Sequence, residues 1–255
     1  METITISTVA LIASILTLFS GFGLGTLLMP AIAIFFPIEV AIATTAMVHF
    51  ANNLFKLGLL GQNAKKSVLL AFGVPAIIFA IVGALTLTWL SNASHVIDYI
   101  AFGKTMHVSP IKLIIGILIL SFVILESIPK FSTIAVEQKF LAIGGMLSGF
   151  FGGLSGHQGV FRSMFLIKAG LSKEQFVATG VILAVMVDTS RLLIYGLDIP
   201  KLDVDWTLVC VASVSAFIGS YLGAKLLKKI TISIVQTVVS ILLTIVAIGM
   251  MTGVL

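Results

Sequence analysis

Two short glycine-rich motifs carry the residues best suited to chemistry in this sequence. The first is Ser20-Gly21-Phe22-Gly23-Leu24-Gly25, and the second is Ser155-Gly156-His157-Gln158-Gly159. Glycine weakens a continuous helix, and a helix that starts after such a break presents free backbone N–H groups. Free N–H groups at a helix N-terminus bind anions, and serine hydroxyls add further donors. The two motifs therefore predict one anion-binding pocket, if the fold brings them together.

Arg162 follows the second motif in a stretch that carries no other charge from Phe140 to Ile167. A charged side chain inside an apolar segment is costly in a membrane and usually serves function. The planar guanidinium group of arginine matches oxyanions well. We therefore predict that Arg162 contributes to the pocket, against the alternative that its side chain reaches out to a polar interface.

Asp188 and Arg191 lie three positions apart in another apolar stretch, a spacing at which they can pair on one helix. Asn53 and Lys56 are their counterparts in the first half, so the polar pattern recurs but the acid does not. A structural ion pair and a role in substrate or proton binding both fit this spacing. Asp188 is the first candidate for proton coupling, and His157 is the second.

Other polar residues have simpler explanations. His49 and Asn52 lie at helical spacing in the same region, and either can hydrogen-bond across helices. Glu39 and Glu174 each begin a predicted helix, where an acidic side chain interacts favourably with the helix dipole. The second of these sites, Ser172-Lys173-Glu174-Gln175, also has the pattern of a capping box.

The two motifs belong to a longer internal duplication, in which equivalent positions are 135 residues apart without a gap. Further identical pairs are Met29 and Met164, Ile32 and Ile167, Glu39 and Glu174, Ala43-Thr44 and Ala178-Thr179, and Gly61 and Gly196. In a membrane protein, a duplication with interrupted hydrophobic segments indicates a transporter and points to its binding site.

The composition is that of a membrane protein. Hydrophobic residues make up 59% of the chain and charged residues 10%, and the mean hydropathy is +1.20. The uncharged segments 67–90, 206–224 and 232–255 are each long enough to cross a bilayer, which takes about 20 residues. The net charge of +5 is attributed to lysines in cytoplasmic loops, so no nucleic-acid partner is expected. The start of the chain lacks the features of a cleaved signal peptide, and the single Cys210 cannot form an intrachain disulfide.

Eight apolar stretches organise the chain, at 4–36, 39–62, 67–90, 108–127, 138–168, 173–197, 204–227 and 230–254. The first and fifth are too long for one crossing, and a glycine motif interrupts each. Pro30 adds to the interruption in the first, and Gly149, Gly152 and Gly153 add to it in the second. A weak amphipathic segment is predicted at 96–102. The chain thus divides into two repeats, 1–127 and 128–255, within one all-α membrane domain.

The positions of the lysines favour an arrangement in which 4–36 and 138–168 each double back, as a re-entrant hairpin or as two short spans. One side of the membrane then holds Lys65, Lys66, Lys130, Lys139, Lys168, Lys173, Lys225, Lys228 and Lys229. Lys104 and Lys201 fall on the other side. Because basic residues concentrate in cytoplasmic loops, this arrangement places both termini outside and inverts one repeat relative to the other.

The chain resembles the TauE/SafE family of anion permeases, also called the sulfite exporter family, over essentially its whole length. The family pattern is a glycine-rich segment, a proline and an Ala-Thr pair, here Ser20–Gly25, Pro30 and Ala43-Thr44, with Gly149–Gly159 and Ala178-Thr179 in the second half. The second half departs from it at His157, Gln158 and Arg162, and at Phe165 where a proline is common. The resemblance implies transport of sulfite, sulfonates or related small anions, and the departure indicates a distinct subgroup.

We therefore expect a multi-pass, all-α transporter of the bacterial inner membrane, built from two inverted repeats and driven by the proton gradient or membrane potential. The predicted binding residues are Ser20, Gly21, Phe22, Gly23, Gly25, Asn53, Ser155, Gly156, His157, Gln158, Gly159, Arg162, Asp188 and Arg191. A passive anion channel is the first alternative, and a membrane-embedded partner subunit or enzyme is the second. No catalytic motif is visible, and no cofactor or metal is expected. The expected partners are a small anion and the lipid bilayer, and a homodimer stays open.

Overall fold

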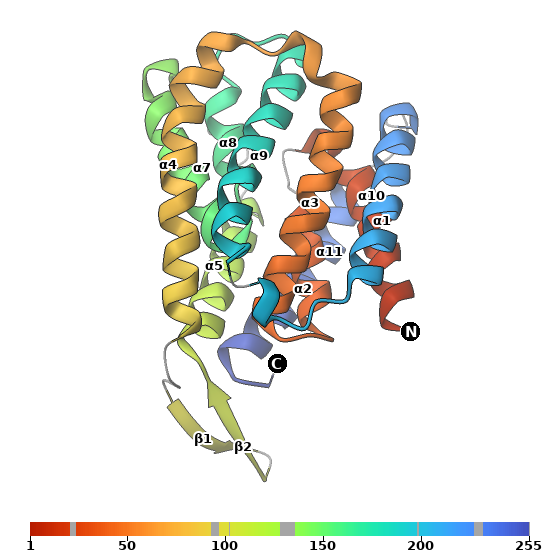
Figure 1. The fold of residues 1–255 in the computed structure, drawn as a ribbon, viewed down its shortest axis with the longest axis vertical. Helices are drawn as coiled ribbons and strands as arrows, with labels where there is room; N and C mark the ends of the chain where they lie inside the picture. The colour runs from red at the N-terminus through yellow and green to blue at the C-terminus, as the bar shows by residue number, and fades with distance from the viewer. Residues whose placement is uncertain are drawn as a thin grey trace.

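The computed structural model describes residues 1–20, 24–92, 97–101, 103–127, 136–197, 199–226 and 232–254. The described residues form ten α-helices and one two-stranded sheet (Figure 1). The helices are α1 (Glu2–Ser20), α2 (Leu24–Ala33), α3 (Ile38–Leu60), α4 (Lys66–Ser91), α5 (Pro110–Ser127), α7 (Leu141–Ser155), α8 (Gly159–Leu166), α9 (Lys173–Tyr195), α10 (Trp206–Leu226) and α11 (Ile232–Met251). Short 3₁₀ turns occur at Gly61–Asn63, Gln138–Phe140 and Ile199–Lys201.

The helices follow the predicted apolar stretches closely. In the described part of the chain, α4, α9 and residues Trp206–Lys225 of α10 are long and apolar enough to cross a membrane. Trp89 and Trp206 are 71% and 58% exposed near the ends of α4 and α10, where interfacial tryptophans are expected. The predicted capping box is confirmed: Ser172 Oγ accepts a hydrogen bond from the Gln175 backbone N–H, and Gln175 Oε1 accepts one from the Ser172 backbone N–H.

A β-hairpin occupies the region of the predicted amphipathic segment. The amphipathic segment predicted at 96–102 contains strand β1 (Ile97–Ala101), which pairs antiparallel with β2 (Lys104–Val108). Isoleucine and tyrosine favour a strand, and Gly103 supplies the turn with a φ of 73°, which residues with a side chain rarely adopt. His107 Nδ1 lies 2.8 Å from Asp98 Oδ1 across the hairpin. The hairpin is therefore an exception to the otherwise helical architecture.

Helix boundaries recur at the offset of the sequence duplication. Helices α1 and α7 end at Ser20 and Ser155, and α2 and α8 begin at Leu24 and Gly159. The ranges of α3 and α9 are offset by 135 residues at both ends, and α4 and α10 end at the same offset. The second long apolar stretch is thus interrupted after its first helix, and a short helix follows the interruption.

The helices pack in pairs around a central contact. Helix α3 packs against α9, α1 packs against α10, and α7 packs against α4. Helices α5 and α11 also pack together, as do the consecutive pairs α1–α2 and α7–α8. Figure 1 shows both termini toward the end of the molecule that carries the hairpin, with the α3–α4 connection at the opposite end. The central α3–α9 contact positions the candidate site.

Glycines hold α7 directly against the backbone of α4. A Cβ added at Gly145, Gly149 or Gly153 would lie 2.0–2.2 Å from the backbone oxygen of Phe72, Ala76 or Ala80, respectively. Small residues allow such close approach of helices in membranes. The expectation that the glycines at 149, 152 and 153 interrupt the helix was wrong: α7 continues through them. Gly149 and Gly153 pack on α4, and Gly152 packs on Val187 of α9, so close packing stabilises the helix at these positions.

Candidate functional site

Asp188 lies at the centre of the α3–α9 contact, where its side chain is fully buried. Its Oδ2 lies 2.6 Å from His49 Nδ1 and accepts a hydrogen bond of 3.1 Å from Asn53 Nδ2. Its Oδ1 accepts hydrogen bonds of 3.1 Å from Gln158 Nε2 and from Arg191 Nε. A carboxylate with this many donors is stabilised in its ionised form, because ionised oxygens only accept. Asp188 is therefore the fixed negative charge of the buried cluster.

Two arginines extend the cluster along α8 and α9. Arg191 Nη2 lies 2.8 Å from Asp188 Oδ1, which makes a buried ion pair between residues one helical turn apart. Arg162 Nη1 donates a hydrogen bond of 3.2 Å to Gln158 Oε1, and Arg162 Nε would lie 3.6 Å from a Cβ added at Gly180. Gln158 thus connects Arg162 to Asp188. The predicted residues Gln158, Arg162, Asp188 and Arg191 are brought together.

The second glycine motif forms a sharp turn beside this cluster. Gly156 has a φ of 83°, in the left-handed region, and ends α7. A Cβ at Gly156 would lie 2.9 Å from Arg191 Nη1, so the turn packs directly on the guanidinium group. Ser148 Oγ donates a hydrogen bond of 2.9 Å to Gln158 O, which fixes the turn before α8 begins at Gly159. Only glycine combines this backbone conformation with this close approach.

Part of the first motif can be placed next to the second. A Cβ added at Gly25, in the first turn of α2, would lie 3.7 Å from the Gly156 backbone oxygen. It would also lie 3.9 Å from His49 Cδ2. Gly21, Phe22, Gly23 and the side chain of Ser20 lie outside the described residues. The structure therefore brings the described part of the first motif to the second motif and to α3.

His157 and Ser155 lie at the edge of the site and face other groups. His157 Nδ1 is 3.0 Å from Ser155 Oγ, and the His157 ring stacks on Phe122 with a centroid distance of 5.1 Å. Phe151 and Phe161 complete this aromatic cluster. His157 Nε2 is buried, and no hydrogen-bond partner for it occurs in the described part of the chain.

Positive charge exceeds negative charge in this buried region. Lys56 is 5% exposed on α3, and the positive charge of Arg162 repels its ammonium group. Asp188 is the one buried carboxylate among the residues whose burial the structure describes, and it pairs with Arg191. Within the described cluster, the one carboxylate near Lys56 and Arg162 is therefore already paired with another cation.

The sequence prediction did not include three residues that the structure places in or near the site. The sequence could have indicated two of them. Lys56 is the counterpart of the predicted site residue Arg191, and His49 precedes the predicted site residue Asn53 by one helical turn. Tyr195 had no such signal: its hydroxyl donates a hydrogen bond to the Gly153 backbone oxygen, which only the packing of α9 on α7 reveals.

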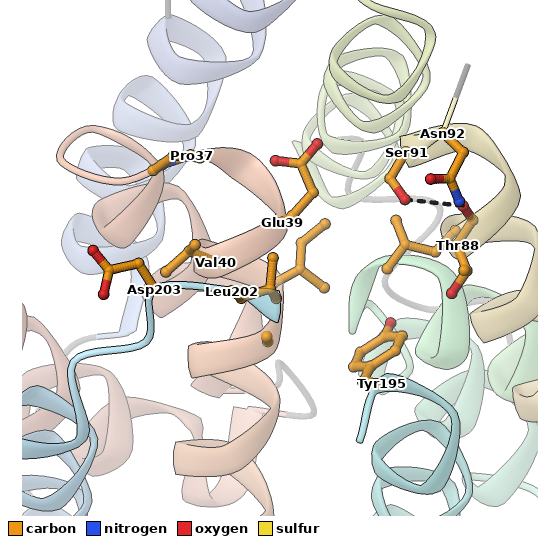
Figure 2. Close-up of a pocket in the computed structure, with 12 residues that line it drawn as sticks. Pro37, Glu39, Val40, Thr88, Ser91, Asn92, Tyr195, Leu202 and Asp203 are labelled. Atoms are coloured by element: carbon orange, nitrogen blue, oxygen red, sulfur yellow. Dashed lines mark hydrogen bonds between the residues drawn. The ribbon is translucent and has the colours of Figure 1, made fainter. Parts of the chain in front are cut away.

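An open cavity of about 470 Å³ approaches the cluster from the end of the molecule that carries the hairpin. Its lining includes the exposed Asn92 and Asp203, the partly exposed Glu39, and the buried Ala43 and Tyr195. Figure 2 shows Glu39 and Asp203 on one side of the cavity and Ser91, Asn92 and Tyr195 on the other. Tyr195 is one helical turn beyond Arg191 on α9, so the buried end of the cavity lies next to the charged cluster.

The family of the chain agrees with these features. A family model described as "Sulfite exporter TauE/SafE" matches residues 6–250. The chain therefore belongs to the TauE/SafE sulfite exporter family, which is a family of membrane transporters of sulfur anions, and it is an integral membrane protein. Comparisons with curated proteins and with solved structures gave no match.

Proposed function

We propose that this protein is a multi-pass secondary transporter that moves a small sulfur oxyanion or organosulfonate across the bacterial inner membrane. The observation that carries the proposal is the excess of positive charge around Asp188. Lys56 and Arg162 are buried or partly buried near one carboxylate, which is already paired with Arg191. Uncompensated charge inside a membrane is unfavourable, and a bound anion would neutralise it.

The backbone around the glycine motifs supports an anion site at the same place. Helix α8 begins at Gly159, directly after the Gly156 turn, and α2 begins at Leu24 beside it. Free N–H groups in the first turn of each helix, and the positive end of each helix dipole, would point toward a shared anion. In this proposal the motif segments Gly21–Gly25 and Gly156–Gly159 cradle the anion, and Arg162 supplies charge-assisted hydrogen bonds.

Packing supports the proposed inverted repeat. The contact of α1 with α10 becomes that of α7 with α4 when each helix is replaced by its counterpart in the other half. Asn53 donates directly to its own counterpart, Asp188. A residue can contact its counterpart only near the axis that relates the two halves. An axis lying in the membrane plane would make the halves inverted, which is the architecture of many secondary transporters.

Helix lengths support the proposed re-entrant segments. Helix α2 has 10 residues and α8 has 8, so each is about 12–15 Å long, roughly half the hydrocarbon thickness. Each packs back on the helix that precedes it. The lysine-bearing start of α9 and end of α10 lie away from the hairpin end, which supports a cytoplasmic location for that side.

The first test measures transport in proteoliposomes with ³⁵S-thiosulfate, an anion whose charge does not change near neutral pH. Arg162→Gln should lower the initial uptake rate at least about tenfold, because hydrogen bonds to charged groups contribute roughly 1.5–3 kcal/mol. Lys139→Gln is the matched control, since Lys139 is exposed and pairs with Glu137 at the surface. Unchanged uptake in folded Arg162→Gln would remove Arg162 from the site.

The same preparation separates a transporter from a channel. A transporter should show counterflow, in which unlabelled thiosulfate inside the vesicles accelerates entry of labelled thiosulfate, and its rate should saturate. High, non-saturating conductance without counterflow would support the channel instead. If wild-type protein moves none of sulfite, sulfate, thiosulfate, sulfoacetate, taurine or small carboxylates, the proposed function is wrong.

A further inference from the structure

His49 connects the buried carboxylate of α9 to the junction of the two glycine motifs. Its side chain is buried, with a residue exposure of 3%, and its Nδ1 lies 2.6 Å from Asp188 Oδ2. Asn53 Nδ2 lies 3.0 Å from the same ring nitrogen and donates to the same carboxylate oxygen. One edge of the imidazole ring is therefore held by a fixed negative charge on the other half of the chain.

The opposite edge of the ring faces the glycine motifs. His49 Cδ2, the ring carbon bonded to Nε2, would lie 3.9 Å from a Cβ added at Gly25. The same Cβ would lie 3.7 Å from the backbone oxygen of Gly156. The Cδ2 edge of His49 therefore lies close to the place where an anion is proposed to bind, and the neighbouring Nε2 lies 3.4 Å from Asn53 Nδ2.

The charges around His49 determine where a proton can be held. Asp188 and Arg191 face it from α9, Lys56 lies two turns further along α3, and Arg162 and His157 lie on the α7–α8 side. The described α2 carries no titratable side chain. Asp188 accepts from four side chains, and protonation would remove one of these acceptor positions. The imidazole can take a proton at Nε2 while it keeps the Nδ1 hydrogen bond to Asp188.

We propose that His49 is the proton-binding residue that couples proton binding to anion binding, an inference that rests on the proposed transport function. A proton from solution adds to the Nε2 lone pair of neutral His49, and the product is an imidazolium cation. This cation gains an N–H donor at Nε2, beside the ring edge that lies close to Gly25. The cations Arg191 and Lys56 oppose protonation of the empty site, and a bound anion removes that opposition. Proton and anion therefore bind cooperatively, and each raises the affinity for the other by the same factor.

The decisive measurement is proton uptake on anion binding by the purified wild-type protein in weakly buffered detergent solution. A pH-indicator dye should report up to about one proton taken up per thiosulfate bound, at a pH where His49 is neutral in the empty site. His49→Gln, which cannot titrate, should bind thiosulfate without proton uptake. His107→Gln is the matched control, because His107 also contacts an aspartate but lies on the exposed hairpin. Its proton uptake should equal that of the wild type.

The outcomes distinguish this inference from the proposed function. Thiosulfate binding or flux in the wild type with no proton uptake at any pH would overturn the inference and leave the transport proposal intact. Proton uptake that persists in folded His49→Gln would also overturn it. Absence of any anion binding in the wild type would overturn both proposals.

A second measurement covers the case in which His49→Gln does not fold. The wild type, labelled with ¹⁵N-histidine, has four histidines. Single changes to glutamine at His95, His107 and His157 identify the signals of the other three, which leaves that of His49. A shift of the His49 signal to the imidazolium form on addition of thiosulfate supports the proposal, and no shift overturns it.

Discussion

The contact of α7 with α4 and that of α1 with α10 involve equivalent helices of the two halves, yet different side chains build them. The α7–α4 contact places three glycines of α7 directly against the backbone of α4. In the α1–α10 contact, Gly219 of α10 approaches the Leu11 backbone oxygen of α1. Ser14, the counterpart of Gly149, lies 2.7 Å from Ser220 Oγ, and Ser220 Oγ lies 2.8 Å from the side-chain amide of Asn52. Equivalent helix pairs in the two halves are therefore held together in different ways, by glycine-to-backbone contact in one half and by a polar network in the other.

The centre of the molecule shows the same divergence in charge. Asn53 and Asp188 are counterparts and hydrogen-bond each other, but only the second half carries the acid. The comparison teaches that helix pairing is shared by the halves, whereas charge and hydrogen bonding are divided unequally between them. Four predictions test this division.

The largest effect is expected from Asp188→Asn. The change leaves Arg191 buried beside Lys56 and Arg162 without a carboxylate, and breaking a buried ion pair in this way costs about 3–5 kcal/mol. The midpoint of thermal unfolding in detergent should fall sharply. The double variant Asn53→Asp with Asp188→Asn should recover part of the loss, since it restores one carboxylate in the same hydrogen-bonded group. No recovery would mean that the two positions are not interchangeable.

The next effect concerns the glycine contact. Gly149→Ala should destabilise the protein by about 1–3 kcal/mol or more, because the added methyl group would lie 2.2 Å from the Ala76 backbone oxygen. Gly58→Ala is the control, since a Cβ at Gly58 meets no atom within 4 Å and alanine favours a helix. Equal unfolding midpoints for the two variants would contradict the close α4–α7 contact.

A smaller effect is expected in the polar network of the α1–α10 contact. Ser220→Ala removes hydrogen bonds with Ser14 and Asn52, and such interhelical bonds contribute about 0.6 kcal/mol on average in membranes. The same unfolding assay should therefore show a modest shift, well below that of Gly149→Ala. A shift in the unfolding midpoint as large as that of Gly149→Ala would show that the polar network is the main determinant of the α1–α10 contact.

The smallest effect is kinetic and compares two counterpart acids. Glu39 lines the cavity at the hairpin end, whereas Glu174 lies in the capped first turn of α9. Glu39→Gln should accelerate thiosulfate entry from the hairpin side roughly twofold at low salt, because it removes a repelling charge, and the gain should fade at high salt. Glu174→Gln should not change entry from that side. An equal response of both variants would argue against entry through this cavity.

Local features of the sequence predict much of this fold because they depend on short stretches of chain. Hydropathy and length predicted the helices, and Ser172 with Gln175 predicted the start of α9. The duplication predicted that Asn53 and Asp188 occupy equivalent places. Neither hydropathy nor spacing could show that they contact each other, because that contact depends on how α3 meets α9.

The sequence by itself determined the membrane class, the family, the helix ends and the polar residues available for a site, since each follows from residue types along the chain. Only the tertiary structure decided which of these residues meet. It placed His49 on Asp188 from 139 positions away, assigned the glycines of α7 to packing, and formed a hairpin at 97–108. These outcomes depend on which helix faces pack together, and that choice minimises buried charge and empty space over the whole molecule.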